Sequence, residues 1–461
     1  MTRIRLPVEL IHLIFRIICS CISIPELADE LGRLSLACRE WADIAQSLLL
    51  SVYVRHGCQY QQDRLLKTLL SSPHLVGKVN SFWENPRILS ADPVAFNLTA
   101  IRNLYQELAS SRNMKELILT LRDSTFPSNV HSILLSSTNL TSLSLFEVNH
   151  FPVQLLYQCT SLRHLHLVNA GFSGFNKASG TLDDSSRVDS GPPAPIQRPY
   201  LSDLYIEVVE KDPAIMAWFL NHECAFDISQ LRAFHCLDII HIETYTLAQS
   251  LIRLTSTTLE ELALSPPYMF TNPTEVDSGK YNGFGHPLPN LRRLKLPLQH
   301  NFSDQASHFF WAAAFLSNLS NPERLEELDI PCIFHGDGLY RPNPDHGWDT
   351  FNAVFSPNAD GSWAHFDPDI KQMPFKFPNL KIVRLGVIRL SSGLPAKHRT
   401  DRFVGVVDRL LRNISMTELL KVSVSNEPGY VDNSECWYHA PFPPEEKIVW
   451  GTVIDLTGDS D

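Results

Sequence analysis

The amino-acid sequence predicts an α/β protein in which a small helical module precedes a long repetitive array built on a parallel sheet. Three observations favour this fold class. Apolar residues recur at helical spacing near the N-terminus. A short apolar motif then recurs through most of the remaining chain. Amphipathic helical stretches fall between copies of the motif, where parallel strands require crossover connections.

The N-terminal module, residues 1–56, is expected to be helical. In LPVELIHLIFRII the apolar residues from Leu6 to Ile18 recur at three- and four-residue steps, which places them on one stripe of a helix. A second stretch places Leu34, Cys38 and Trp41 on one side of another helix. Periodicity alone favours a docking module and a cap on the following array equally.

The order of these features resembles the F-box, and in particular the F-box-like domains abundant in basidiomycete fungi. The matching residues are Leu6-Pro7-x-Glu9-Leu10, then Ile14 and Ile18, then Leu34-x-Leu36-x-Cys38-Arg39, with Trp41 three residues past Cys38. The resemblance covers about 50 of the 461 residues. The connection from Ile18 to Leu34 is slightly longer than the family's pattern, which could alter the middle helix.

This resemblance implies docking on a Skp-type adaptor, which attaches an F-box protein to a cullin-RING ubiquitin ligase. A helix pair too small to bury both of its apolar faces leaves one exposed for a partner helix, which is compatible with that role. The candidate adaptor-binding residues are Leu6, Pro7, Leu10, Ile14 and Leu36.

The rest of the chain carries a repeated motif, apolar-x-x-apolar-x-apolar. Its ten copies begin at Met114, Leu140, Leu162, Leu201, Leu231, Leu259, Leu291, Leu325, Leu380 and Leu419, 22 to 55 residues apart. Many copies follow an Asn or another polar residue. The series resembles an irregular leucine-rich repeat, which implies a horseshoe whose units each add one strand to a curved parallel sheet and cross back through a helix or loop. The alternative is an ordinary α/β domain with parallel strands.

Domain boundaries follow from this pattern. Residues 57–110 are expected to form a helical linker or N-terminal cap, residues 111–426 the array, and residues 427–461 a C-terminal tail. Within the array, residues 173–199 lack apolar periodicity and are expected to be a disordered loop. The insert 331–378 is rich in aromatic residues and is expected to be at least partly packed. Helical crossovers are expected near residues 60–70, 101–110, 303–320 and 401–415.

The residues between the motif's apolar positions are expected to line one face of the sheet, because the apolar side chains point into the stack. The candidate target-binding residues are His164, His166, Asp203, Tyr205, His235, Glu261, Arg293, Lys295, Glu327 and Asp329. This face is chemically mixed, with a basic step between two acidic ones. Such a surface suits a protein target better than a phosphate backbone or a lipid surface.

Composition and charge restrict the other partners. The 461 residues include 39 Lys plus Arg against 50 Asp plus Glu, so the formal net charge is −11 and no nucleic-acid partner is expected. No run of about 18 uncharged apolar residues occurs, so we expect no membrane span. The nine cysteines show no disulfide-framework spacing. A reducing location, in the cytoplasm, the nucleus or both, is therefore expected.

Two sets of residues could supply metal-binding or acid-base chemistry, but other interpretations are favoured for both. His164 and His166 would share one sheet face, but no third ligand is placed beside them. The carboxylates and imidazoles around His346 and His365 could form an acid-base pair, although loop charge is the more favoured interpretation. We expect no metal, no cofactor and no enzymatic activity in this chain.

The tail ends in GTVIDLTGDSD, where a short β-prone segment precedes acidic residues. This order resembles a motif that binds the small ubiquitin-like modifier by adding a strand to its sheet edge, through Val453, Ile454 and Leu456. A closing strand that caps the array is an equally favoured alternative.

Together these features predict a substrate-recognition subunit of a cullin-RING ubiquitin ligase. The alternative is a stand-alone repeat scaffold that binds proteins without ligase association.

Overall fold

The computed structural model describes residues 14, 31, 33, 34, 36, 41, 42, 44–46, 67–84, 98–120, 133, 135, 137–148, 151–173, 175, 176, 181, 182, 198–207, 214–222, 224–237, 239, 242–266, 287–301, 308–319, 321–335, 377–389, 420–425, 453 and 454. The chain divides into two compact units. The first comprises Met1–Leu201, Asn221–Asp227 and Glu445–Lys447, and the second comprises Ser202–Leu220, Ile228–Pro444 and Ile448–Asp461. Both contain parallel β-strands joined by helical crossovers, which confirms the α/β class and its parallel sheet.

The first unit is built on four parallel strands. In spatial order they are β1 (Ser81–Glu84), β2 (Glu116–Thr120), β3 (Ser142–Phe146) and β5 (His164–Val168). The connections include η1 (Pro73–Lys78), α6 (Leu98–Ser110) and η2 (Val153–Gln158). Two small sheets pair β4 (Phe151–Pro152) with β6 (Phe172–Ser173) and β7 (Phe175–Asn176) with β8 (Thr181–Leu182). The β7–β8 hairpin lies inside the loop predicted as disordered, most of which falls outside the described residues.

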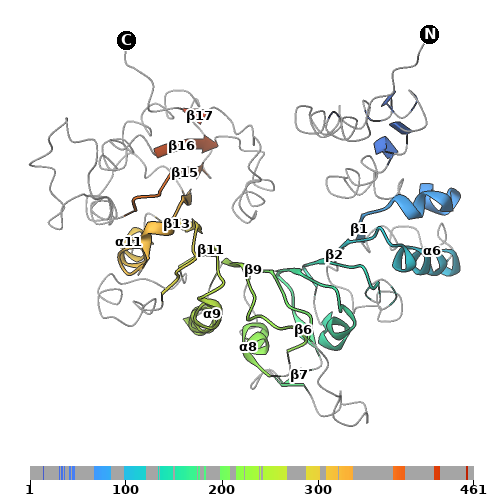
Figure 1. Ribbon diagram of the computed structural model, residues 1–461, viewed down its shortest axis with the longest axis horizontal. Coiled ribbons are helices and arrows are strands. Elements are labelled where there is room, and N and C mark those ends of the chain that lie inside the picture. The colour runs from blue at the N-terminus through green and yellow to red at the C-terminus, as the bar shows by residue number, and fades with distance from the viewer. Residues whose placement is uncertain are drawn as a thin grey trace, which may run out of the picture. The chain divides into compact units, whose positions relative to one another are not determined.

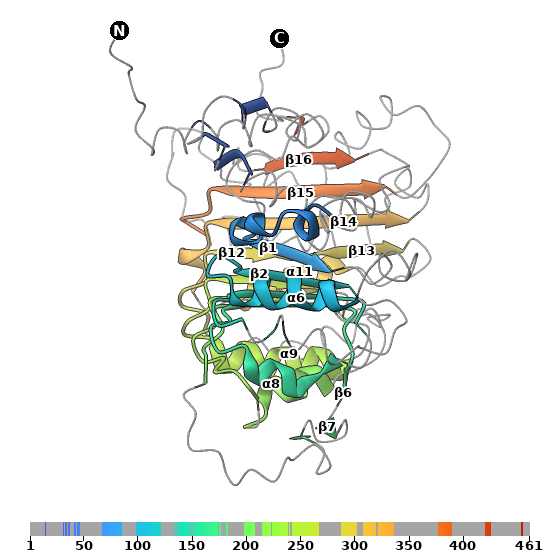
Figure 2. The same cartoon turned by 90° about the vertical axis from the view of Figure 1, so that its right-hand side faces the viewer.

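The second unit continues the same plan with seven parallel strands. In spatial order they are β9 (Asp203–Glu207), β10 (Ala233–Leu237), β11 (Glu261–Leu264), β12 (Arg293–Lys295), β14 (Glu327–His335), β15 (Ile382–Arg389) and β16 (Leu420–Ser425). β13 (Leu298–Asn301) also pairs with β14, and β17 (Val453–Ile454) pairs antiparallel with β16. The arrows of β14, β15 and β16 run the same way in Figure 2.

Helices cover one side of the second unit's strands. They are α8 (Ala214–Leu220), α9 (Ile242–Thr255) and α11 (His308–Ser317), followed by η4 (Pro322–Arg324), and Figure 1 shows all three α-helices on the same side. The indole N–H of Trp311 on α11 donates a hydrogen bond of 2.9 Å to the Tyr245 hydroxyl on α9. This bond satisfies two buried polar groups between α9 and α11.

The sequence motifs align in register across the strands. In the first unit, pairing places Leu117, Leu143 and Leu165 side by side. The equivalent residues in the second unit are Leu204, Phe234, Leu262, Leu294, Leu328 and Val383. Every one of these side chains is 0% exposed. Burying one such side chain stabilises a fold by roughly 1.5–3 kcal/mol. These registered apolar side chains, which we call the leucine column of each unit, therefore form its core.

The structure shows one further copy of the motif that was not predicted from the sequence. β1 pairs with β2 so that Phe82 stands beside Leu117, and Val79 takes the place of the motif's first apolar residue. Glu84 stands where the third apolar residue would be, which hides the copy from a search for leucines. The array therefore begins within the segment predicted as a linker or cap.

The polar residue that precedes many motifs has a structural role. In the first unit, the Asn113 side-chain amide donates a hydrogen bond to the Gly77 carbonyl in the preceding repeat. In the second, the Asn290 amide donates to the Thr257 carbonyl at 2.6 Å, and the Asn379 amide donates to Glu323. Thr258 and Ser161 make the equivalent bonds to Ser229 and Thr138. We call this series the turn ladder, because it joins the turns before successive strands.

Some of the predicted crossover helices, and the start of the predicted insert, lie within the described residues. Residues 101–110 fall within α6, residues 303–320 contain α11, and residues 67–71 are helical. The helix predicted at 401–415 lies outside the described residues, as do residues 336–376 of the insert. β14 runs to His335, so the array extends into the start of that segment.

Candidate functional site

The described part of the N-terminal module includes a strongly exposed leucine. Leu36 is 86% exposed, whereas no other large hydrophobic side chain in the described residues exceeds 54%. Ile14 is helical and half-buried, and Leu31 is fully buried. Leu6, Pro7 and Leu10 lie outside the described residues. At 86% exposure, Leu36 is available to a partner.

The module also contacts the start of the array within the first unit. The Lys78 ammonium group, at the end of η1, donates a hydrogen bond of 2.7 Å to the Gln46 side-chain oxygen. These residues are 32 positions apart, so the bond is a tertiary contact.

The predicted target-binding residues occupy registered positions on the strands. In the first unit, His164 and His166 lie on β5 and are half-buried. In the second unit, residues at the first strand position form a middle row, Asp203, Ala233, Glu261, Arg293 and Glu327. Residues two positions later form an inner row, Tyr205, His235, Ala263, Lys295, Asp329 and Arg384.

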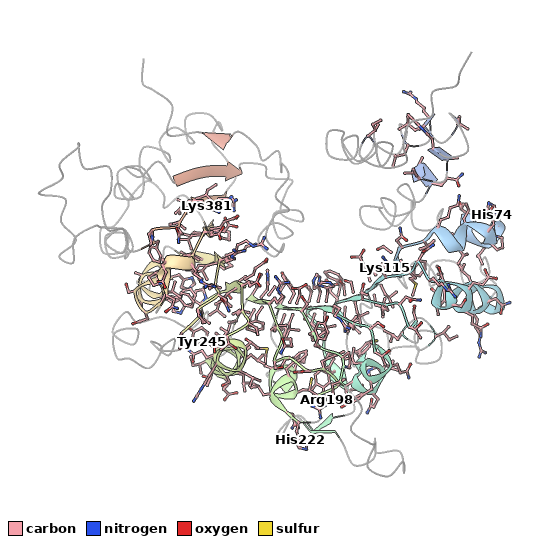
Figure 3. The ribbon with its side chains drawn as sticks, viewed as in Figure 1. His74, Lys115, Arg198, His222, Tyr245 and Lys381 are labelled. Carbon is pink, nitrogen blue, oxygen red and sulfur yellow. The ribbon has the colours of Figure 1, made fainter. Side chains whose placement is uncertain are left out.

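Sequence reasoning overlooked a third row, immediately before the strands. This outer row consists of Arg232, Glu260, Arg292, Glu326 and Lys381, each directly after the first apolar residue of its motif. Aligning the motifs in columns would have revealed it, because the sign of the charge alternates from one repeat to the next. Figure 3 labels Lys381, at the β15 end of the outer row.

Burial increases from the outer row to the inner row. Outer-row side chains are exposed or half-exposed, and those of Glu261, Arg293 and Glu327 in the middle row are 21%, 33% and 26% exposed. Most of the inner row is covered, since Tyr205, His235, Lys295 and Asp329 are 3–7% exposed, whereas the Arg384 side chain at the β15 end is 36% exposed. These four predicted contact residues are therefore not accessible to a macromolecular partner in this conformation.

Charge is ordered by strand in the second unit. From the β11 repeat to the β15 repeat, acidic and basic repeats alternate. The β11 repeat carries Glu260 and Glu261, the β12 repeat Arg292, Arg293 and Lys295, the β14 repeat Glu326, Glu327 and Asp329, and the β15 repeat Lys381 and Arg384. Because opposite charges on directly opposed positions attract and like charges repel, this order favours the observed neighbours.

Ion pairs connect the outer row along its length. Arg232 holds Glu260 with two of its nitrogens, at 2.8 Å from Nη2 and 3.1 Å from Nε. Glu326 lies between two cations, with Arg292 Nε at 3.3 Å and Lys381 Nζ at 2.7 Å. Hydrogen bonds from Arg232 and Lys381 lower the pKa of Glu260 and Glu326, respectively, so both carboxylates are ionised at neutral pH.

The middle and inner rows share one cation. Arg384 Nη1 lies 2.8 Å from Glu327 Oε2 and 2.9 Å from Asp329 Oδ1, and Arg293 pairs with Glu261. Burial raises the pKa of Asp329, an effect that Arg384 opposes. Burial also lowers the pKa of Lys295 to about 8, although the nearby Asp329 carboxylate acts in the other direction. The inner row is thus a buried polar cluster whose charges depend on one another.

At its β9 end, the inner row continues into an aromatic polar cluster. The rings of Tyr205 and His235 lie 5.7 Å apart, and the Tyr205 hydroxyl donates a hydrogen bond to Glu207 at 3.4 Å. All three residues are buried. This arrangement positions the side chains against one another and exposes no reactive group.

The described ranges contain histidine, cysteine and carboxylate side chains, the groups that bind metals or act in catalysis. There, no group of three or more His, Cys, Asp or Glu residues is arranged to hold a metal ion. Burial raises the pKa of Cys159 and of Cys224 to about 12, so these thiols are protonated and poor nucleophiles. The histidines of the acid-base alternative, His346 and His365, lie outside the described residues. In the same ranges, no helix is both long and apolar enough to cross a bilayer.

The tail contributes a short strand to the second unit. Ile454 pairs with Val422 and Val453 with Ser423 in antiparallel register. Leu456 lies outside the described residues. The pairing agrees with the closing-strand interpretation, and modifier binding stays a prediction.

No family model matches the sequence, and no curated protein matches it significantly.

Proposed function

We propose that the chain is a substrate-recognition subunit of a cullin-RING ubiquitin ligase, in which residues 1–56 bind a Skp-type adaptor and the array binds a protein target. The observation that carries the proposal is the order of two modules on one chain, an F-box-like segment followed by registered leucine-rich strands. Ubiquitin transfer would occur on other subunits.

The exposure of Leu36 supports the adaptor-binding role. Burying a leucine stabilises by roughly 1.5–3 kcal/mol relative to leaving it in water, so an 86% exposed leucine is a favourable anchor for a partner. Its motif neighbours Leu34 and Cys38 place it within the F-box-like pattern. The proposed contact is apolar, and its affinity should depend weakly on salt.

The array supports a protein-binding role. Its outer row places arginine, lysine and glutamate side chains immediately before the strands, and arginine is enriched at protein interfaces. Positioning by consecutive strands reduces the entropy lost when a partner binds.

Co-purification with a Skp-type adaptor tests the proposal. The full-length chain should retain the adaptor, whereas a Leu36→Arg variant and a combined Leu6→Ala, Pro7→Ala, Leu10→Ala variant should each lose at least most of it. A matched control is Leu254→Arg, which alters another exposed leucine, on α9. Undiminished adaptor binding by both module variants would remove the assigned role of the first 56 residues.

A stand-alone scaffold is the second candidate. The hydrogen bond from Lys78 to Gln46 favours it, because this bond attaches the N-terminal module to the array as a cap would be attached. Deleting residues 1–56 separates the two functions. The deleted chain should stay soluble and folded if the segment is a docking module, and should aggregate if the segment covers the array's core.

Modifier binding by the tail is a subsidiary proposal. A segment of Val453, Ile454 and Leu456 followed by acids would add a strand to the modifier's sheet edge. Limited proteolysis of the free protein tests whether the segment is available. Protection of residues 445–461 would favour the closing strand and count against an exposed motif.

A further inference from the structure

In the outer row, the basic side chains are more exposed than the acidic side chains. In the pair of Arg232 with Glu260, the side chains are 62% and 34% exposed. Arg292 and Lys381 are 61% and 70% exposed, whereas Glu326 between them is 28% exposed. A molecule that approaches this row meets three cations first, although acids alternate with them along the row.

These cations retain hydrogen-bonding capacity. A guanidinium carries five N–H donors and an ammonium three, more than the contacts that Glu260 and Glu326 accept from them. Further carboxylates from a partner could therefore bind without breaking the existing ion pairs.

The strands set the spacing of the cations. Arg232, Arg292 and Lys381 belong to the β10, β12 and β15 repeats, which are separated by the β11 and β14 repeats. Adjacent strands lie about 4.8 Å apart, so equal charges recur at about 9.6 Å. A polyproline II segment rises about 3.1 Å per residue with three residues per turn, so every third side chain on one side recurs at about 9.3 Å.

We propose that the outer row of the second unit binds an extended acidic protein segment, with carboxylates at about every third residue facing Arg232, Arg292 and Lys381. This inference names the class of target for the array and rests on the protein-binding part of the proposed function alone. A nucleic-acid strand fits less well, because its charges recur at about 3.4 Å along each strand of a duplex and would also face Glu260 and Glu326.

Peptide binding to the full-length chain tests this inference by fluorescence anisotropy. The probe is a labelled peptide of repeated Glu-Pro-Pro, and the reference peptides are Gln-Pro-Pro repeats and a peptide of equal composition with its glutamates clustered. The spaced acidic peptide should bind most tightly, and its affinity should fall as salt is raised.

Charge-removal variants locate the site. Arg232→Gln, Arg292→Gln and Lys381→Gln should each weaken binding by about three- to fivefold, the range of a favourable exposed ion pair, and the control Arg253→Gln on α9 should leave it unchanged. Glu260→Gln and Glu326→Gln remove competing acids, so they should strengthen binding. This opposite change cannot arise from misfolding.

Four outcomes would overturn the inference. They are equal binding of the glutamine peptide, equal binding of the clustered peptide, equal effects of the outer-row and Arg253 variants, and tighter binding of a single-stranded oligonucleotide at the same residues. Adaptor binding distinguishes this failure from that of the ligase proposal. The outer-row variants should keep the adaptor, and Leu36→Arg should keep the peptide.

Discussion

Replacing Lys295 by methionine tests the buried inner row through its effect on pH-dependent stability. Lys295 lies on β12, is 3% exposed and stands in register with Asp329 on β14. Methionine has a similar length and flexibility and no titrating group, so the substitution removes the charge with a small change in packing. The acidic neighbour keeps its contact with Arg384.

The expected magnitude follows from the pKa of Lys295. Burial lowers this pKa from its ordinary value of 10.5 to about 8. Between these two values the unfolded chain binds more protons than the folded chain at this site, so stability rises with pH. Each pKa unit corresponds to about 1.4 kcal/mol. From pH 7 to pH 9.5, the free energy of unfolding of the wild type should therefore rise by about 2 kcal/mol relative to that of Lys295→Met. Below pH 7 the difference between the two proteins should level off.

The assay is urea unfolding of both proteins at several pH values between 7 and 9.5. The difference between proteins must be used, because Cys159 and Cys224 act in the opposite direction. Burial raises the pKa of both thiols to about 12 in the folded protein, so above the ordinary thiol pKa of 9.0 they ionise more readily in the unfolded chain. The free energy of unfolding therefore falls as pH rises above that value. This loss is common to both proteins and cancels in the difference.

A control variant on the same strand is Leu294→Met, which changes packing without changing charge. Its difference from the wild type should be independent of pH. The free energy of unfolding of the wild type minus that of Lys295→Met should rise with pH. If this difference were independent of pH, or fell as pH rises, the burial of a charged amine in the inner row would be refuted.

Three further tests, each by substitution, concern the leucine column, the turn ladder and the Arg384–Asp329 ion pair. Leu262→Ala should lower the free energy of unfolding by about 2–5 kcal/mol in urea titrations, because it opens a cavity in the leucine column, whereas Leu254→Ala on the surface should cost less than 1 kcal/mol or so. Asn290→Ala should cost about 1–2 kcal/mol because it removes the turn-ladder bond to Thr257 and the hydrogen bond that Asn290 accepts from Arg324, and an unchanged stability would show that water replaces both bonds. Arg384→Met should cost about 3 kcal/mol because it leaves Asp329 buried without this cation, and a double-mutant cycle with Asp329→Asn should recover much of the loss.

The strands could be predicted from sequence because the motif itself defines the register. Each leucine must be buried and only one alignment of neighbouring strands buries all of them, as Leu262 and Leu294 illustrate. The copy at Val79 and Phe82 was missed because it contains no leucine and ends on Glu84. The structural pairing, which a single short motif cannot supply, reveals it.

The candidate site could be predicted only in outline. Alternation along a strand indicates which side a residue faces, and it correctly groups Glu261, Arg293 and Glu327 in one row. It does not indicate how much of that side is covered, so Lys295 was expected to be exposed and is buried. The outer row lies in the bend before the strands, where the two-residue period that guided the prediction does not apply.

Reconstitution with a purified Skp-type adaptor and its cullin tests the central claim most directly. The measurement is the mass of the full-length chain by light scattering during size-exclusion chromatography, alone and with both partners. One complex should form that contains the 52.2 kDa chain, the adaptor and the cullin in equal numbers, and Leu36→Arg should keep the chain out of it. Separate elution of the wild-type chain from an intact adaptor–cullin complex would rule out the proposed ligase association.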